Sequence, residues 1–201
     1  MSPAYVKGVE ENCRNAEIVF DKFHVIRQAC EAVDEVRRAE SRLDEEKKQQ
    51  LKETMWLWRK NPENLSQKEQ KRMKRIDHTD LWTSRAYQMR LALQEVYRLP
   101  YCSTARRRFQ SWCGWVRRVA KKAPGQLLEG MVKVANMIES HLEGILAHWT
   151  AKVTNAFLEG LNSVFSATKR KARGYRTARY LIAMLYFVAG KLNIPSTLLT
   201  H

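Results

Sequence analysis

Apolar residues recur every three or four positions along most of this chain, which is the spacing of one face of an α-helix. In residues 22–59 the apolar positions include Phe23, Ile26 and Val33, whereas residues 37–50 are almost wholly polar and predict an exposed helical hairpin or a long projecting helix. Further helices are predicted from the Ser66 capping box, from Thr79 or Asp80 to about Leu99, from Ser103 or Thr104 to about Ala123, over residues 126–148, from Thr154 to Gly174, and from Thr177 to Ala189. The expected fold class is therefore mainly α.

Strand-like sequence is confined to residues 17–20, an apolar run that ends at Asp21. If this run is a short buried β-strand, Asp21 stands at its carboxyl end, where acids line a crevice. Alternatively, Asp21 is the N-cap of the helix that begins near Lys22, and His24 is satisfied in the first helical turn. Both interpretations explain an acid at this point.

The chain is strongly basic, with a formal charge of +15 and a pI near 9.9. Such a charge is typical of proteins that bind polyanions. Residues 96–128 and 160–201 contain no acid, whereas the acids gather in residues 31–69. We expect DNA phosphates to be bound by bases from both acid-free segments, namely Arg106, Arg107, Arg108, Lys169, Arg170, Lys171, Arg173 and Arg176. A merely soluble basic surface is the plainer alternative.

Two tryptophans, Trp112 and Trp115, interleave with the first basic segment. Indole rings beside cations can stack on an unpaired base. However, Trp112, either Trp115 or Val116, and Val119 fit one helical stripe, so the spacing favours packing in the core.

A carboxylate among amide side chains precedes the second basic segment. Asn155, Glu159 and Asn162 share one side of the predicted helix, while Leu158, Leu161 and Phe165 turn away and can pack. An acid with neutral polar neighbours next to Arg and Lys suits a metal ligand beside a phosphate backbone. An ordinary solvated helix face explains the same spacing.

Several segments in order resemble the bacterial insertion-sequence transposases of the ISL3 type, a DDE family related to Mutator-like elements. The matching segments are Asp21-Lys22-Phe23-His24-Val25, Trp58-Arg59-Lys60-Asn61-Pro62-Glu63-Asn64-Leu65, Thr154-Asn155 through Glu159-Gly160-Leu161-Asn162, and Lys171-Ala172-Arg173-Gly174-Tyr175-Arg176. The resemblance implies a ribonuclease H-like core that binds two divalent metals, Mg2+ or Mn2+, and cuts and rejoins DNA at terminal inverted repeats.

The resemblance assigns roles residue by residue. Glu159 matches the third catalytic acid and is the expected metal ligand, while Asp21 and His24 match an acid-x-x-His pair that supports the site. Residues 1–5 look like those that directly follow the second acid, so the first two acids would precede Met1 and this chain would be the carboxy-terminal half. The implied parts are a residual core strand and helix start (1–26), a helical insertion (27–150), and core helices with the third acid and a basic cluster (151–201).

Other classes of site find no support in the sequence. The four cysteines show no CxxC pair and no histidine at ligand spacing, which favours reduced thiols over zinc or disulfides. His141 and His148 stand two helical turns apart, and a structural role is favoured over a metal pair. The longest apolar run, residues 180–190, is too short for a bilayer. We expect neither a membrane nor a small-molecule partner.

Three functions remain open at this stage. The favoured one is DNA transposition by a truncated insertion-sequence transposase, inactive alone, which acts in the bacterial cytoplasm at the nucleoid as a homo-oligomer or a transposase subunit. The second is a stand-alone helical DNA-binding protein that binds element ends or regulates transposase. The third is a helical interaction or structural protein whose basic surface binds RNA or ribosomes.

Overall fold

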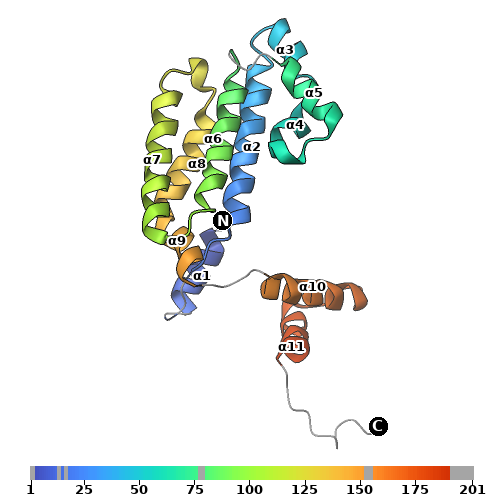
Figure 1. Cartoon of the computed structure of the whole chain (residues 1–201). Helices are drawn as coiled ribbons and strands as arrows, with labels where there is room; N and C mark the ends of the chain where they lie inside the picture. The colour runs from blue at the N-terminus through green and yellow to red at the C-terminus, as the bar shows by residue number, and fades with distance from the viewer. Residues whose placement is uncertain (1–2, 13–14, 16–17, 77–79, 152–155, 191–201) are drawn as a thin grey trace, which may run out of the picture. The chain divides into compact units, whose positions relative to one another are not determined.

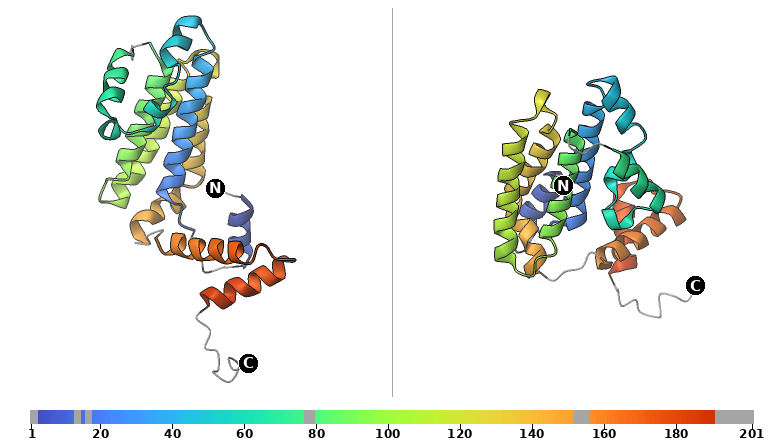
Figure 2. Two further views of the ribbon diagram at one scale, coloured as in Figure 1. Left: turned by 90° about the vertical axis from the view of Figure 1, so that its right-hand side faces the viewer. Right: turned by 45° about the horizontal axis from the view of Figure 1, so that its top comes forward.

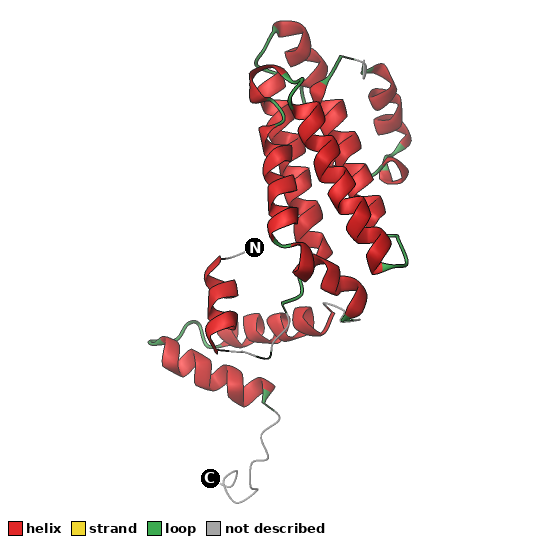
Figure 3. Cartoon of the chain, turned by 90° about the vertical axis from the view of Figure 1, so that its left-hand side faces the viewer, coloured by secondary structure: helices red, strands yellow, loops and turns green. Residues whose placement is uncertain are grey.

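The computed structural model is almost wholly helical and divides into two compact units, residues 1–152 and 153–201. It describes residues 3–12, 15, 18–76, 80–151 and 156–190, with the side chains of residues 3–5 and 156–159 outside the description. Figure 3 shows helices and loops, and no strand, over these described ranges. The first unit contains α1 (Pro3–Asn12), α2 (Lys22–Glu40), α3 (Glu45–Leu51), α4 (Met55–Arg59), the short 3-10 helix η1 (Pro62–Asn64), α5 (Gln67–Arg75), α6 (Trp82–Val96), α7 (Cys102–Ala120), η2 (Pro124–Gln126), α8 (Glu129–Ser140) and α9 (Leu142–Thr150). The prediction of a mainly α fold is confirmed.

The long helices α2, α6, α7 and α8 pack side by side as an antiparallel bundle (Figure 1). Figure 2 shows the same four helices from two further sides. Residues 97–101 join α6 to α7 and residues 121–128 join α7 to α8, and such short connections favour antiparallel neighbours. The first unit is thus built around a four-helix bundle.

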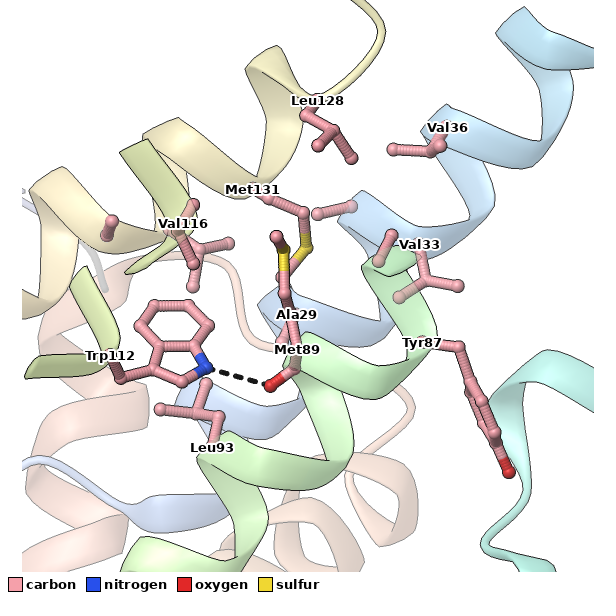
Figure 4. Packing of buried hydrophobic residues seen from close by; sticks show 14 of the residues in the cluster. Ala29, Val33, Val36, Tyr87, Met89, Leu93, Trp112, Val116, Leu128 and Met131 are labelled. Carbon is pink, nitrogen blue, oxygen red and sulfur yellow. Dashed lines mark hydrogen bonds between the residues drawn. The ribbon is translucent and has the colours of Figure 1, made fainter. Parts of the chain in front are cut away.

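The core of the bundle receives side chains from all four helices (Figure 4). Met89 and Leu93 of α6 are fully buried, as the apolar spacing predicted. Trp112 of α7 is 4% exposed, and its Nε1 donates a hydrogen bond of 2.8 Å to the Met89 carbonyl. Trp115 is partly buried against the same core. The prediction of core packing is therefore confirmed for Trp112, whereas Trp115 is only partly covered.

The start of α6 is capped by a side chain from another helix. The carboxylate of Glu40, at the end of α2, accepts hydrogen bonds of 2.7 Å from the backbone N–H groups of Trp82 and Thr83 and from Thr83 Oγ1. Glu40 is 0% exposed. A buried carboxylate therefore satisfies donors that a helix start leaves without an intrahelical partner.

This cap corrects two expectations. The expected cap at Thr79 or Asp80 is wrong at Asp80, because Leu81 holds the N-cap position without a side-chain hydrogen bond of its own, and Thr79 lies outside the described residues. The expectation that residues 37–50 are exposed holds for residues 38, 42–46, 48 and 49, whereas α2 continues into the core as far as Glu40.

Residues 60 and 61, within a segment that carries the family resemblance, are fastened to α6. Arg90 of α6 is 2% exposed and donates to Asn61 Oδ1 at 2.7 Å and to the Lys60 carbonyl at 3.0 Å. The Tyr87 hydroxyl donates to the same carbonyl at 2.9 Å. Residues 60 and 61 of the matching segment therefore have a structural role, which is to hold this part of the chain against α6.

The predicted strand is not formed over residues 18–20, which have no regular secondary structure. The N–H of Phe20 donates to the carbonyl of Gly144 in α9 at 2.9 Å, and the Phe20 ring lies 4.9 Å from the His141 ring. A helix end, rather than a second strand, is the hydrogen-bond partner of this segment. The fold therefore uses residues 18–20 as a strap across α9.

The single helix predicted over residues 126–148 is two helices, α8 and α9, separated at His141. His141 contacts Phe20, whereas His148 packs edge-on against Trp149, with ring centroids 5.0 Å apart. Each histidine thus packs against an aromatic ring, which confirms the structural interpretation for the pair.

The second unit contains α10 (Ala156–Lys171) and α11 (Ala178–Ala189), which pack against each other. Thr177 caps α11 as predicted, since its side chain accepts a hydrogen bond from the Tyr180 N–H. The predicted cap at Thr154 lies outside the described residues. No side chain of α11 is fully buried, and Tyr186 is 72% exposed.

Candidate functional site

Asp21 and His24 meet at the start of α2. Asp21 is the N-cap: its Oδ1 accepts a hydrogen bond of 2.9 Å from the Phe23 N–H, and its Oδ2 lies 3.5 Å from His24 Nδ1. The Asp21 side chain is 17% exposed and that of His24 is 62% exposed. The N-cap interpretation is confirmed, because the carboxylate binds the first turn of its own helix. A catalytic role for this pair stays a prediction.

The negative charge of Asp21 acts on two aromatic side chains, Tyr97 and His148. Burial, together with the negative charge of Asp21, raises the pKa of the Tyr97 hydroxyl. Burial, reinforced by the positive charge of Lys22, lowers the pKa of His148 below 6.5, against the opposing effect of Asp21. Tyr97 stacks on Trp149 with ring centroids 5.5 Å apart. Burial is therefore the main cause of both pKa shifts.

Glu159 lies in α10, as predicted, with its side chain outside the described residues. It belongs to the second unit and Asp21 to the first, and each unit is described by itself. A joint site of Asp21, His24 and Glu159 therefore stays a prediction.

The described part of the chain holds no group of three or more His, Cys, Asp or Glu side chains that could bind a metal ion. Asp21 is already engaged as a helix cap. Divalent ions such as Mg2+ need several oxygen ligands at one place. The described residues therefore do not fit such an ion by themselves, and Glu159 as a metal ligand stays a prediction.

The basic cluster at the end of α10 is open to solvent. Lys169, Arg170 and Arg173 line a hollow of about 510 Å³ beside the end of the helix. Arg173 has φ of 54° and Gly174 has φ of 112°, so the chain turns through left-handed backbone here. Cations in a last helical turn also complement the helix dipole, which is a structural reason for part of the cluster. The remaining members, Lys171 and Arg176, are exposed as well.

The arginines of α7 fall into two groups. Arg106 donates to Glu143 at 2.7 Å, and Arg117 donates to Glu139 at 2.7 Å. Each pair lowers the pKa of its glutamate, through the hydrogen bond from the arginine first. The charge of Arg106, which the sequence assigned to DNA, is thus balanced within the fold.

The second group consists of Arg107, Arg108 and Arg118. All three are exposed, and no carboxylate in the described ranges forms an ion pair with them. Their charge remains available to a phosphate backbone. The prediction for Arg107 and Arg108 therefore gains a physical basis that Arg106 lacks.

A further basic surface was missed in the sequence. The exposed bases of α5 are Lys68, Lys71, Arg72, Lys74 and Arg75, and within the described ranges none forms an ion pair with a carboxylate. Glu69, the one acid of this helix, is occupied by Lys60 at 2.7 Å and by the capping box of Ser66. The run of bases after the capping box was the available signal, and the neighbouring acid-rich segment obscured it.

No helix in the described ranges combines the length and apolar character needed to cross a membrane.

No solved structure matches the chain significantly. The chain is 26% identical over 184 residues to the transposase for insertion sequence element IS1001 of Bordetella parapertussis, which covers 90% of this chain and 44% of that protein. It is 25% identical over 200 residues to the transposase for insertion sequence element IS1557 of Mycobacterium tuberculosis, which covers 88% of this chain and 43% of that protein.

The chain thus spans less than half the length of the curated relatives that it matches. The model of a DDE family of the ISL3 type, described as transposase, matches residues 1–185 and therefore nearly all of this chain. Residues 21, 24 and 159, together with the basic segments up to residue 176, all fall inside the match. This chain belongs to the ISL3 family of DDE transposases.

Proposed function

We propose that this chain acts in DNA transposition, as part of a transposase that binds the terminal inverted repeats of an insertion sequence. The observation that carries the proposal is the set of exposed cations on α5, on α7 and around the end of α10 that form no ion pair with a carboxylate of the described residues, in a chain of this family. Such cations bind DNA phosphates and give affinity without reading sequence. Family membership supplies the expectation that the DNA is an element end.

In the assembled enzyme we assign Glu159 to the metal-binding acids and Asp21 with His24 to the support of the site. Two-metal phosphoryl transfer needs carboxylates that hold ions about 3.5–4 Å apart. We infer that a ribonuclease H-like core provides this arrangement, with Mg2+ or Mn2+ as the ion, and that the four-helix bundle is an insertion into that core. Action on DNA would place the protein at the nucleoid, in a homo-oligomer or as a transposase subunit.

The salt dependence of DNA binding tests this proposal. The logarithm of affinity falls linearly with the logarithm of salt concentration, with a slope of about 0.9 per phosphate contact. Joint replacement of Arg170 and Arg173 by alanine should therefore reduce the slope by about two units, as measured by fluorescence anisotropy. The matched control removes two exposed bases that are paired within the fold, Arg27 and Lys48, and should change the slope little.

Two outcomes contradict the proposal. Equal slopes for the two double variants would show that Arg170 and Arg173 do not contact DNA. Equal affinity for the element's own inverted repeat and for a scrambled duplex would remove the assignment to element ends.

A second candidate function is a stand-alone regulator that occupies element ends. The hydrophobic core of the first unit favours it, because every described residue of that core comes from this unit. Glu159→Gln separates the two candidates in a full-length transposase that carries this sequence. Loss of cleavage with DNA binding retained supports the catalytic assignment, whereas unchanged cleavage leaves the regulator as the better account.

A further inference from the structure

A groove of about 570 Å³ lies between α6 and α7 on the bundle. Its lining includes Leu99, Arg108, Ser111, Trp112, Trp115 and Arg118. Residues 108, 111, 115 and 118 follow one another at helical spacing, so α7 presents a continuous face to the groove. Its volume lies in the range in which proteins hold a single small organic group.

The groove has a rigid aromatic side. Trp112 is 4% exposed and is fixed by its hydrogen bond to the Met89 carbonyl, which Figure 4 shows. Trp115 stands one turn further along α7, is only partly buried, and lines the groove. An indole recessed between two helices is reached by one planar ring and not by the stacked base pairs of a duplex. Aromatic side chains of this kind stack on any base, because every base has a π-face.

The groove also has a cationic rim. Arg108 and Arg118 are exposed, and in the described ranges neither has a carboxylate partner. Glu95, the one acid that lines the groove, is held by Arg98 at 2.9 Å. The other arginine face of α7 is neutralised by Glu139 and Glu143. The groove is therefore the part of α7 at which positive charge and an accessible ring coincide.

We propose that this groove binds an unpaired nucleotide of the DNA, with its base stacked on Trp115 and its flanking phosphates held by Arg108 and Arg118. The proposal rests on DNA binding as proposed above and names the part of the DNA that this face takes. Arg108 and Arg118 alone would bind any phosphate backbone. The recessed ring adds a preference for DNA that exposes a base.

The test compares two DNAs of equal phosphate number with the full chain. One is a blunt duplex, and the other carries a three-nucleotide overhang with 2-aminopurine as its fluorescent base. The chain should bind the overhang more tightly and quench 2-aminopurine. Trp115→Leu should cost about tenfold in affinity for the overhang, within the range of one stacked base, and less than about twofold for the blunt duplex. Trp56→Leu removes an indole that is 61% exposed on α4 and should change neither.

A second pair of variants guards against loss of folding in Trp115→Leu. Ser111→Glu places a carboxylate on the exposed groove face of α7, and Gln110→Glu places the same charge outside the groove. Ser111→Glu should abolish the preference for the overhang, whereas Gln110→Glu should keep it.

The outcomes separate the two proposals. Duplex binding without quenching, or a preference for the overhang that survives both Trp115→Leu and Ser111→Glu, overturns the groove as a nucleotide site and leaves the proposed function standing. Absence of binding to both DNAs overturns the proposed function and the groove site together.

Discussion

Replacement of Glu40 by alanine should strongly destabilise the bundle. The side chain is 0% exposed and accepts three hydrogen bonds of 2.7 Å at the start of α6, two from backbone N–H groups and one from the Thr83 hydroxyl. Alanine removes all three acceptor contacts and leaves the donors inside the protein. It also removes a negative charge from the positive end of the helix dipole.

The magnitude follows from these contacts. A buried donor without a partner costs about 1–3 kcal/mol, and two backbone donors are affected. The Trp82 N–H is only part-buried, so water recovers some of its loss, whereas the Thr83 N–H is buried. Loss of the charge at the helix start adds about 1 kcal/mol. We therefore expect the free energy of unfolding to fall by about 3–5 kcal/mol for Glu40→Ala, and by about 2 kcal/mol for Glu40→Gln, which keeps one acceptor oxygen.

Urea denaturation followed by circular dichroism at 222 nm measures this loss. Glu31→Ala is the matched control, because Glu31 lies on the same helix, is 51% exposed and forms only a surface pair with Arg27. Such a pair contributes about 0.3–0.5 kcal/mol. The reasoning is refuted if Glu40→Ala loses less than 1 kcal/mol, or if the Glu40 and Glu31 variants lose the same amount.

Three further predictions concern other fixed points of the first unit. Arg90→Lys should lower the free energy of unfolding by about 2–4 kcal/mol in urea titrations, because an ammonium cannot replace the guanidinium's bonds to Asn61 and the neighbouring carbonyl. Gly144→Ala should cost about 1–3 kcal/mol, since the added Cβ would lie 2.6 Å from Phe20 Cδ2. The pKa of His148 is lowered below 6.5 in the folded state, so its contribution to stability is complete above pH 6.5 and is lost as the pH falls toward the folded-state pKa. His148→Gln should therefore reduce the change in melting temperature between pH 7.5 and pH 5.5.

Each of these variants has an internal comparison. Gly114→Ala places its Cβ 3.4 Å from the mobile end of Arg118 and should be nearly neutral, so an equal loss at Gly144 and Gly114 would contradict the strap. An Arg90→Lys variant as stable as the native chain would show that Asn61 needs no guanidinium. If the melting temperature of His148→Gln changed with pH as much as that of the native chain, the loss of stability in acid would come from another group.

The local signals in the sequence predicted most of the helices. The Ser66 capping box is formed as expected, with the Glu69 carboxylate 2.9 Å from the Ser66 N–H. The apolar spacing placed the inward residues of α6 and α7 correctly, because a helix in a bundle must bury one face. Thr177 as the cap of α11 is confirmed for the same local reason.

Contacts between distant parts of the chain were not predictable. In the sequence alone, Glu40 is one of many acids and Arg90 is one of many bases. Their buried partners, the start of α6 for Glu40 and Asn61 for Arg90, are known only from the fold. Residues 18–20 have strand-forming side chains, but a strand also needs a partner, and the partner here is the start of α9. Pairing of Arg106 with Glu143 depends on the fold of α7 against α9 in the same way.

For the candidate site too, local features followed from the sequence and distances between segments did not. The spacing around Asp21 allowed both a catalytic acid and a helix cap, and the structure shows the cap. The position of Glu159 on a helix followed from periodicity, whereas its distance from any other acid depends on segments that sequence spacing does not relate. The bases of α5 could be read from the sequence, but their exposure could not be predicted from it.

The strap between Phe20 and Gly144 also fixes where the polypeptide enters and leaves the bundle. Phe20 immediately precedes the cap of α2, and Gly144 is followed by six more residues of α9, about 9 Å of helix. The chain therefore enters and leaves the bundle at neighbouring positions. A host domain can carry such a segment without its two flanks being forced apart, since the gap that it must bridge is small. If the bundle is the insertion proposed above, variation in its size would leave the geometry of the domain that carries it unchanged.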